Sequence, residues 1–152
     1  MALTWPLQKS GSSNEPVQTV QYLLRAHGYT VGIDGFFGPR TEAAVRAFQS
    51  AQSAQSAQSL TVDGTVGDQT WPALIITVRH GDRSEKGDAV RAVQDQANFR
   101  TGDAAHPFPV DGIFGSRTDN WVRAFQQGVG ITVDGIVGPV TWNHLVKEKL
   151  NT

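Results

Sequence analysis

Cysteine is absent from this 152-residue chain. That absence excludes disulfide bonds, metal sites built on thiolates and a cysteine nucleophile. It leaves the cellular compartment open, because a protein without cysteine can fold on either side of a membrane.

Long hydrophobic runs and an excess of charge of one sign are also missing. No apolar run approaches the roughly 20 residues that span a bilayer, and the formal net charge is −1 with lysine and arginine dispersed along the chain. Nucleic-acid-binding proteins usually carry a clustered basic surface. We therefore expect neither a membrane nor a nucleic acid as a partner.

The N-terminal residues 1–6 lack a basic stretch followed by an apolar one, so we identify no signal peptide. Action outside the cell would require a signal that has been removed, or another route of export.

Signals of catalysis are sparse. The four histidines show no paired metal-ligand spacing, and no Gly-x-Ser-x-Gly motif is present, so we predict no metal, no cofactor and no catalytic serine. The 14 acidic residues leave a carboxylate-pair glycosidase open by composition. Apolar residues make up 39% and charged residues 18% of the chain, which is typical of a folded protein with a core.

An eight-residue motif, Asp-Gly-x-x-Gly-x-x-Thr, occurs four times. The copies, called here the first to fourth Asp-Gly turns, are residues 34–41, 63–70, 111–118 and 134–141. Aspartate can bond to the backbone that follows it and glycine tolerates a positive φ, so each motif predicts a tight turn. The threonine hydroxyl is expected to bond back and hold the turn closed.

The turns alternate in type and define a larger unit that occurs twice. The first and third turns lead into a stretch ending in Phe-Gln, at Phe48 and Phe125, and the second and fourth are followed directly by Trp71 and Trp142. Apolar residues follow helical spacing. The sequence therefore predicts an all-α fold of two small three-helix bundles in tandem, covering residues 1–78 and 79–152, with little or no sheet.

Two insertions distinguish the copies. Residues 50–60 contain Ala-Gln-Ser triplets where the second copy has only residues 127–131; this predicts an extended second helix or a mobile loop, most simply a tolerated surface insertion. Residues 100–110 replace residues 29–33 of the first copy. If that loop borders a binding groove, the copies differ in specificity, or one has lost binding.

These ordered motifs resemble those of the peptidoglycan-binding domain 1 family, in tandem. The first copy has the family's Gly28-Tyr29 pair and both Asp-Gly turns; the second lacks Gly-Tyr and has Trp121 where alanine is usual. The resemblance implies three-helix bundles without catalytic residues, which bind bacterial peptidoglycan beside a cell-wall hydrolase domain or partner. It also implies an extracellular or cell-wall location.

Ligand contacts are expected on loops held by a rigid scaffold. The candidates are Tyr29, Asp34, Phe37 and Arg40 in the first copy, and Phe108, Asp111, Phe114 and Arg117 in the second. For Phe37 and Phe114 a position partly in the core is the alternative. The arginines suit a carboxylate of the stem peptide, or equally a neighbouring acidic side chain. Trp71, Trp142, Phe48 and Phe125 are interpreted as core. Two other functions stay open: a protein-interaction module without wall binding, and a small wall hydrolase.

Overall fold

The computed structural model describes residues 3–55, 60–101 and 108–147. Within these ranges it contains six α-helices, one 3₁₀ turn and two isolated β-bridges, but no β-strand longer than a bridge. The elements are α1 (Glu15–Ala26), α2 (Pro39–Gln55), α3 (Thr70–Leu74), η1 (Ser84–Lys86), α4 (Gly87–Thr101), α5 (Ser116–Val129) and α6 (Pro139–Lys147). The all-α prediction of two tandem three-helix units is confirmed.

Proline sets the start of several helices. Pro16 lies in the first turn of α1, and Pro39 and Pro139 are the first residues of α2 and α6. The first turn of a helix tolerates proline because its N–H groups have no partner within the helix.

An extended segment precedes the first helix of each copy. It pairs with the second Asp-Gly turn in the first copy and with the fourth in the second copy. Gln8 forms a bridge with Val66, and Val78 forms the equivalent bridge with Val137. The indole N–H groups of the two core tryptophans reinforce these pairings. Trp71 donates to the carbonyl of Pro6 at 2.7 Å and Trp142 donates to that of Ile76 at 2.9 Å.

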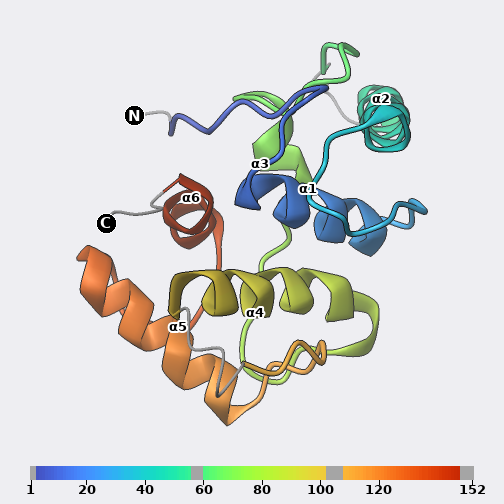
Figure 1. Ribbon diagram of the computed structural model, residues 1–152. Coiled ribbons are helices and arrows are strands. Elements are labelled where there is room, and N and C mark those ends of the chain that lie inside the picture. The colour runs from blue at the N-terminus through green and yellow to red at the C-terminus, as the bar shows by residue number, and fades with distance from the viewer. Residues whose placement is uncertain (1–2, 56–59, 102–107, 148–152) are drawn as a thin grey trace.

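The two copies pack through their first helices. Figure 1 shows α1 and α4 lying side by side across the middle of the molecule. Val20 and Leu23 of α1 and Val90 and Val93 of α4 are fully buried in one continuous hydrophobic cluster. The copies therefore share a core. The division at residues 78 and 79 stays a prediction.

The tryptophans predicted as core are confirmed, since Trp71 and Trp142 are both 0% exposed, and Phe48 is 1% exposed. Phe125 differs, because it is only partly buried and packs against the edge of the core. Trp121, one helical turn earlier, stacks on its ring at 5.4 Å. Both rings are partly buried and pack against the edge of the core.

The Ala-Gln-Ser stretch lengthens α2, which has 17 residues against 14 in α5. Ser53 Oγ lies 2.9 Å from both the amide nitrogen and the carbonyl oxygen of Leu60. These contacts bring together the two ends of the insertion. Residues 56–59 and most of the other insertion, residues 102–107, lie outside the described residues.

Candidate binding site

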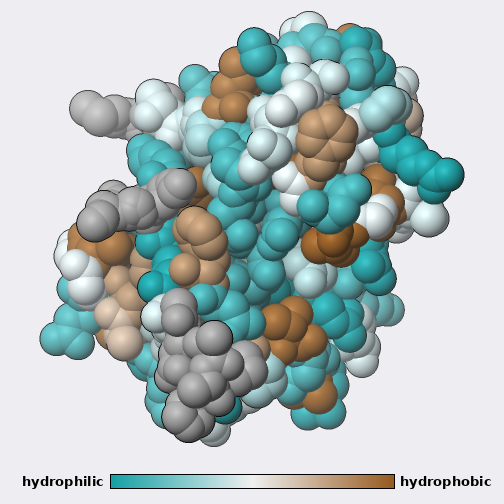
Figure 2. All heavy atoms as spheres, viewed as in Figure 1, coloured by the Kyte–Doolittle hydropathy of each residue, from teal (hydrophilic) through white to brown (hydrophobic). Residues whose placement is uncertain are grey.

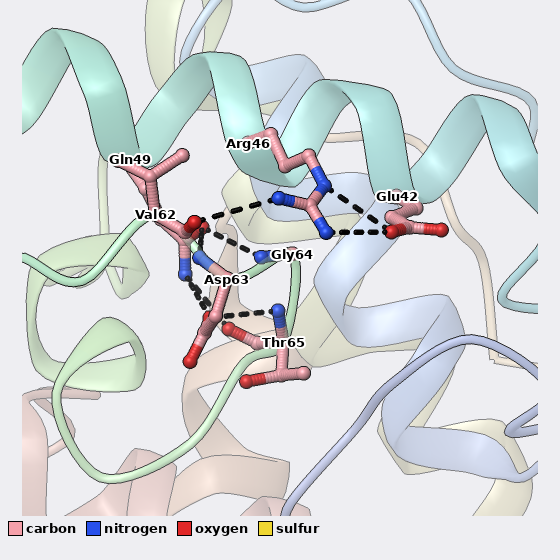
Figure 3. Close-up of polar contacts among 7 residues, drawn as sticks. All are labelled: Glu42, Arg46, Gln49, Val62, Asp63, Gly64 and Thr65. Atoms are coloured by element: carbon pink, nitrogen blue, oxygen red, sulfur yellow. Dashed lines mark hydrogen bonds and ion pairs between the residues drawn. The ribbon is translucent and has the colours of Figure 1, made fainter.

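A buried glutamine holds each Asp-Gly turn in place, as Figure 3 shows for Gln49. Its side-chain nitrogen donates to Asp63 Oδ1 at 3.1 Å, to the Thr65 carbonyl at 2.8 Å and to Thr70 Oγ1 at 2.9 Å. Its side-chain oxygen accepts from the N–H groups of Asp63 and Gly64 at 3.2 and 3.0 Å. One amide therefore satisfies five polar groups of the turn.

The same arrangement recurs at the other three turns. The glutamines are Gln21, Gln94 and Gln126, and each donates to the aspartate, to the carbonyl two residues later and to the threonine hydroxyl of its own turn. The threonine hydroxyls do help to close the turns, but as acceptors of a bond from a glutamine on the preceding helix. The predicted bond back from the hydroxyl is seen at the fourth turn, where Thr141 Oγ1 donates to the Ile136 carbonyl at 3.3 Å. The glycines have φ between 74° and 77°, as predicted, and this region disfavours residues with a Cβ.

The aspartates of the turns accept hydrogen bonds from the backbone of their own turn. The Phe36 N–H donates to Asp34 Oδ1 at 3.0 Å and the Ile113 N–H donates to Asp111 Oδ1 at 3.0 Å. These backbone bonds, together with the bonds from Gln21 and Gln94, lower the pKa values of both carboxyl groups. Each aspartate thus holds its turn and presents an ionised carboxylate at the surface.

Three of the glycines lie under an arginine from the preceding helix. We call the glutamine that bonds each turn its clamp. Three residues before a clamp glutamine stand Arg46, Arg91 and Arg123, and a Cβ on the glycine of the turn would come within 3.0 Å of each guanidinium group. Figure 3 shows Arg46 bonded to Glu42 and to the Val62 carbonyl above the second turn. At the first turn the equivalent residue is Gln18.

The structure separates the four candidate residues of the first copy. Phe37 is 0% exposed and has no surface to offer a ligand. Tyr29 is half-buried and packs edge-on against Phe48 at 6.3 Å. Asp34 and Arg40 are both exposed. Asp34 lines a pocket with residues of α1 and with Phe99, and Arg40 is not part of that lining.

In the second copy, three of the four candidates come together. Phe108, Asp111 and Arg117 line a pocket of about 180 Å³ beside the third turn. The guanidinium of Arg117 lies over the Phe108 ring, 5.0 Å from its centroid, a geometry with cation–π attraction. Phe114 is 1% exposed and belongs to the core; its position in a turn suggested an accessible ring, but the ring points inward.

The aromatic contact continues beyond this pocket. Phe108 meets Trp121 at 6.4 Å, Trp121 stacks on Phe125, and Arg100 lies over Phe125 at 5.0 Å. Trp121 departs from the family pattern, where alanine is usual, and was assigned no role from the sequence. In the first copy Ala44 occupies the equivalent position, so this row of rings belongs to the second copy.

A larger pocket was not anticipated from the sequence. It has a volume of about 520 Å³ and lies at the fourth turn, between the end of α5 and the start of α6. Its lining includes Ile131, Asp134 and Val140. The signal that could have revealed it is the difference between Val140 and Gln69, which stand directly before the threonine of the fourth and second turns.

Three further features bear on other kinds of site: the hydropathy of the visible face, groups of metal-ligating side chains and the length of the helices. Figure 2 shows one face of the molecule as mostly hydrophilic, with hydrophobic residues in separate patches. Among the described residues, no group of three histidine, aspartate or glutamate side chains could hold a metal ion. In the same part of the chain, the helices are too short or too polar to cross a bilayer.

Comparison with known proteins identifies the repeated unit. A family model described as a putative peptidoglycan binding domain matches twice, at residues 13–74 and 86–145. The chain is 32% identical over 142 residues to N-acetylmuramoyl-L-alanine amidase CwlL of Bacillus licheniformis, which covers 91% of this chain and 36% of that protein.

Other relatives show the same partial coverage. The chain is 35% identical over 121 residues to the amidase CwlM of Mycobacterium tuberculosis, covering 72% of the chain and 27% of CwlM. It is 32% identical over 87 residues to a zinc D-Ala-D-Ala carboxypeptidase of Streptomyces albus G, covering 57% of the chain and 31% of that enzyme. The chain thus spans about a third of the length of these relatives. Because the family model matches most of the chain, this protein belongs to the peptidoglycan-binding domain family, of which it carries two copies.

Proposed function

We propose that this chain binds bacterial peptidoglycan without cleaving it and holds a hydrolase domain or a separate partner at the cell wall. The similar proteins are amidases and a carboxypeptidase. About two thirds of each lies outside the matched part, which is compatible with a matched part that binds and a remainder that catalyses. Action would then take place outside the membrane, at the wall.

The observation that carries the proposal is the pocket of Phe108, Asp111 and Arg117. A guanidinium group held over an aromatic ring keeps its N–H donors available for a carboxylate. The ionised Asp111 at the same pocket accepts hydrogen bonds from amide or hydroxyl groups. Peptidoglycan offers carboxylates, amides and hydroxyls close together, so this pair of charges suits its chemistry.

The first copy contributes a second contact in this proposal, through Tyr29, Asp34 and Arg40. Two linked sites raise overall avidity when both reach the same polymer. The pocket of the second copy combines Asp111 with Arg117, whereas Arg40 is not part of the pocket that Asp34 lines. We therefore expect the second copy to supply more of the affinity.

Sedimentation with purified cell walls tests the proposal. We expect the parent protein to sediment and to release no soluble muropeptides. Replacing Arg117 by alanine removes a charge-assisted bond and should weaken binding about tenfold or more. Arg79→Ala is the matched control. Arg79 is exposed on the segment between the copies, and its replacement removes the same positive charge.

Each outcome discriminates between functions. Release of muropeptides by the parent protein would indicate a hydrolase. Failure of the parent to sediment would favour a module that binds another protein. Equal sedimentation of Arg117→Ala and the parent would show that the wall-binding surface lies elsewhere.

A further inference from the structure

The pocket at the fourth Asp-Gly turn has the size and lining of a ligand site. Its volume of about 520 Å³ falls within the range of roughly 300–1,000 Å³ typical of small-molecule pockets. Ile131, Ile136 and Val140 supply aliphatic surface, and Thr132 and Asp134 supply polar groups. Val140 is 48% exposed, so its side chain faces solvent at this site.

A fixed carboxylate borders this aliphatic surface. Asp134 Oδ1 accepts from the Gln126 side chain at 3.0 Å and from the Ile136 N–H at 2.9 Å. These bonds immobilise the carboxylate while the residue stays exposed at the pocket. A ligand that combines small aliphatic groups with an N–H donor would satisfy both kinds of surface.

The equivalent position in the first copy is closed by its own side chains. Gln69 Oε1 accepts from the Thr61 N–H at 3.1 Å, across the place where the second copy has its pocket. Asp68 Oδ1 accepts from the Trp5 N–H at 2.7 Å and ties the turn to the N-terminal segment. Val140 and Pro139 replace these residues in the fourth turn, and neither side chain carries an acceptor.

The lining also distinguishes between peptide and sugar. All of the lining residues lie in the described part of the chain, and none is aromatic. Sugar rings bind well on aromatic faces, which this pocket does not offer. We propose that the pocket at the fourth turn binds a short peptide with small aliphatic side chains, whose N–H donates to Asp134. This inference rests on the proposed function, and it assigns this pocket to the stem peptide of peptidoglycan rather than to the glycan strand.

The test uses two soluble probes on the whole chain. One is the stem peptide released enzymatically from purified walls, and the other is the glycan strand freed of peptide. Titration is followed by the NMR amide shifts of residues 130–141. We expect saturable shifts with the peptide and none in this segment with the glycan.

Matched variants locate the effect. Val140→Gln recreates the side chain that closes the second turn, and we expect it to weaken peptide binding about tenfold, as the loss of one aliphatic contact implies. Val133→Gln is the control, because Val133 is 46% exposed, directly precedes the fourth turn and is not part of the lining. The reverse change, Gln69→Val, should open a weaker second site in the first copy.

The results separate this inference from the proposed function. Shifts with glycan and not peptide, or equal peptide affinity of Val140→Gln and the parent, would overturn the peptide assignment even when walls are bound. A parent protein that fails to sediment with walls contradicts the proposed function, and the peptide titration still decides whether this pocket takes a peptide.

Discussion

Gln96 of α4 donates a hydrogen bond to Thr19 of α1, with 2.9 Å between Nε2 and Oγ1. Both side chains are fully buried, at 1% and 0% exposure, and they belong to different copies of the repeat. A second polar bond between the copies runs from the Asn143 side chain of α6 to the Thr4 carbonyl, at 2.7 Å. Polar bonds as well as apolar packing therefore join the two copies.

Thr19→Val should destabilise the protein, because it leaves the Gln96 amide buried without its acceptor. The expected loss in free energy of unfolding is about 1–3 kcal/mol, with the two copies still unfolding in one transition. The measurement is urea denaturation followed by circular dichroism.

A double variant provides the control for this bond. Adding Gln96→Met replaces both partners by apolar groups of similar shape and should recover part of the loss. If Thr19→Val unfolds at the same urea concentration as the parent, the bond does not join the copies in solution.

Gln126→Leu should be far more disruptive than a neighbouring change. Gln126 makes five hydrogen bonds to the fourth turn, and losing them leaves buried polar groups unsatisfied at a cost of about 3–5 kcal/mol. Gln127→Leu alters an exposed glutamine on the same helix and should change stability by less than about 0.5 kcal/mol. Similar thermal midpoints for the two variants would contradict the stabilisation of the fourth turn by Gln126.

The roles of aspartate and glycine in the turns were predictable from sequence, but the bonds from the glutamine on the preceding helix were not. The aspartate bonds two residues along its own chain and glycine tolerates the required φ, so both effects can be derived from a short window. Gln21 and Asp34 are 13 residues apart and Gln94 and Asp111 are 17 apart. Such pairings depend on how helix and turn pack, which a local pattern does not contain.

The candidate site shows the same division. Phe108, Asp111 and Arg117 were predicted from loop position and chemistry, and the structure brings them to one pocket. Phe37 and Phe114 occupy equivalent loops, yet their rings turn into the core. Helical periodicity predicted apolar faces on α1 and α4, but it could not show that these two faces cover each other.

Acid should weaken the turns through their aspartates. Backbone bonding by Ile136, with help from Gln126, lowers the pKa of Asp134 below its ordinary value of 3.8. A carboxyl group whose pKa is lower in the folded state contributes its full stability above the unfolded pKa, and loses it as the pH falls through the folded pKa. Stability should therefore decline below about pH 4.

Asp134→Asn isolates this contribution, since asparagine keeps an acceptor oxygen but cannot ionise. We expect the difference in urea midpoint between the parent and the variant to be smaller at pH 3 than at pH 7. Asp95 acts in the opposite direction, because burial raises its pKa, so total stability alone is a poor readout. A difference that stays constant across this range would argue against an ionised Asp134 as the stabilising form.

Deleting residues 54–59 should leave the fold intact, because the second copy already makes the shorter connection. After deletion Ser53 aligns with Gly130, the residue that ends α5 with a φ of 80°. A left-handed conformation costs an ordinary residue about 1–2 kcal/mol, so the deletion combined with Ser53→Gly should be more stable than the deletion alone by roughly 1 kcal/mol. Thermal denaturation of both variants measures this difference. Equal stability would show that the shortened helix ends in another way, and loss of wall binding in both would show that the Ala-Gln-Ser stretch itself contributes to recognition.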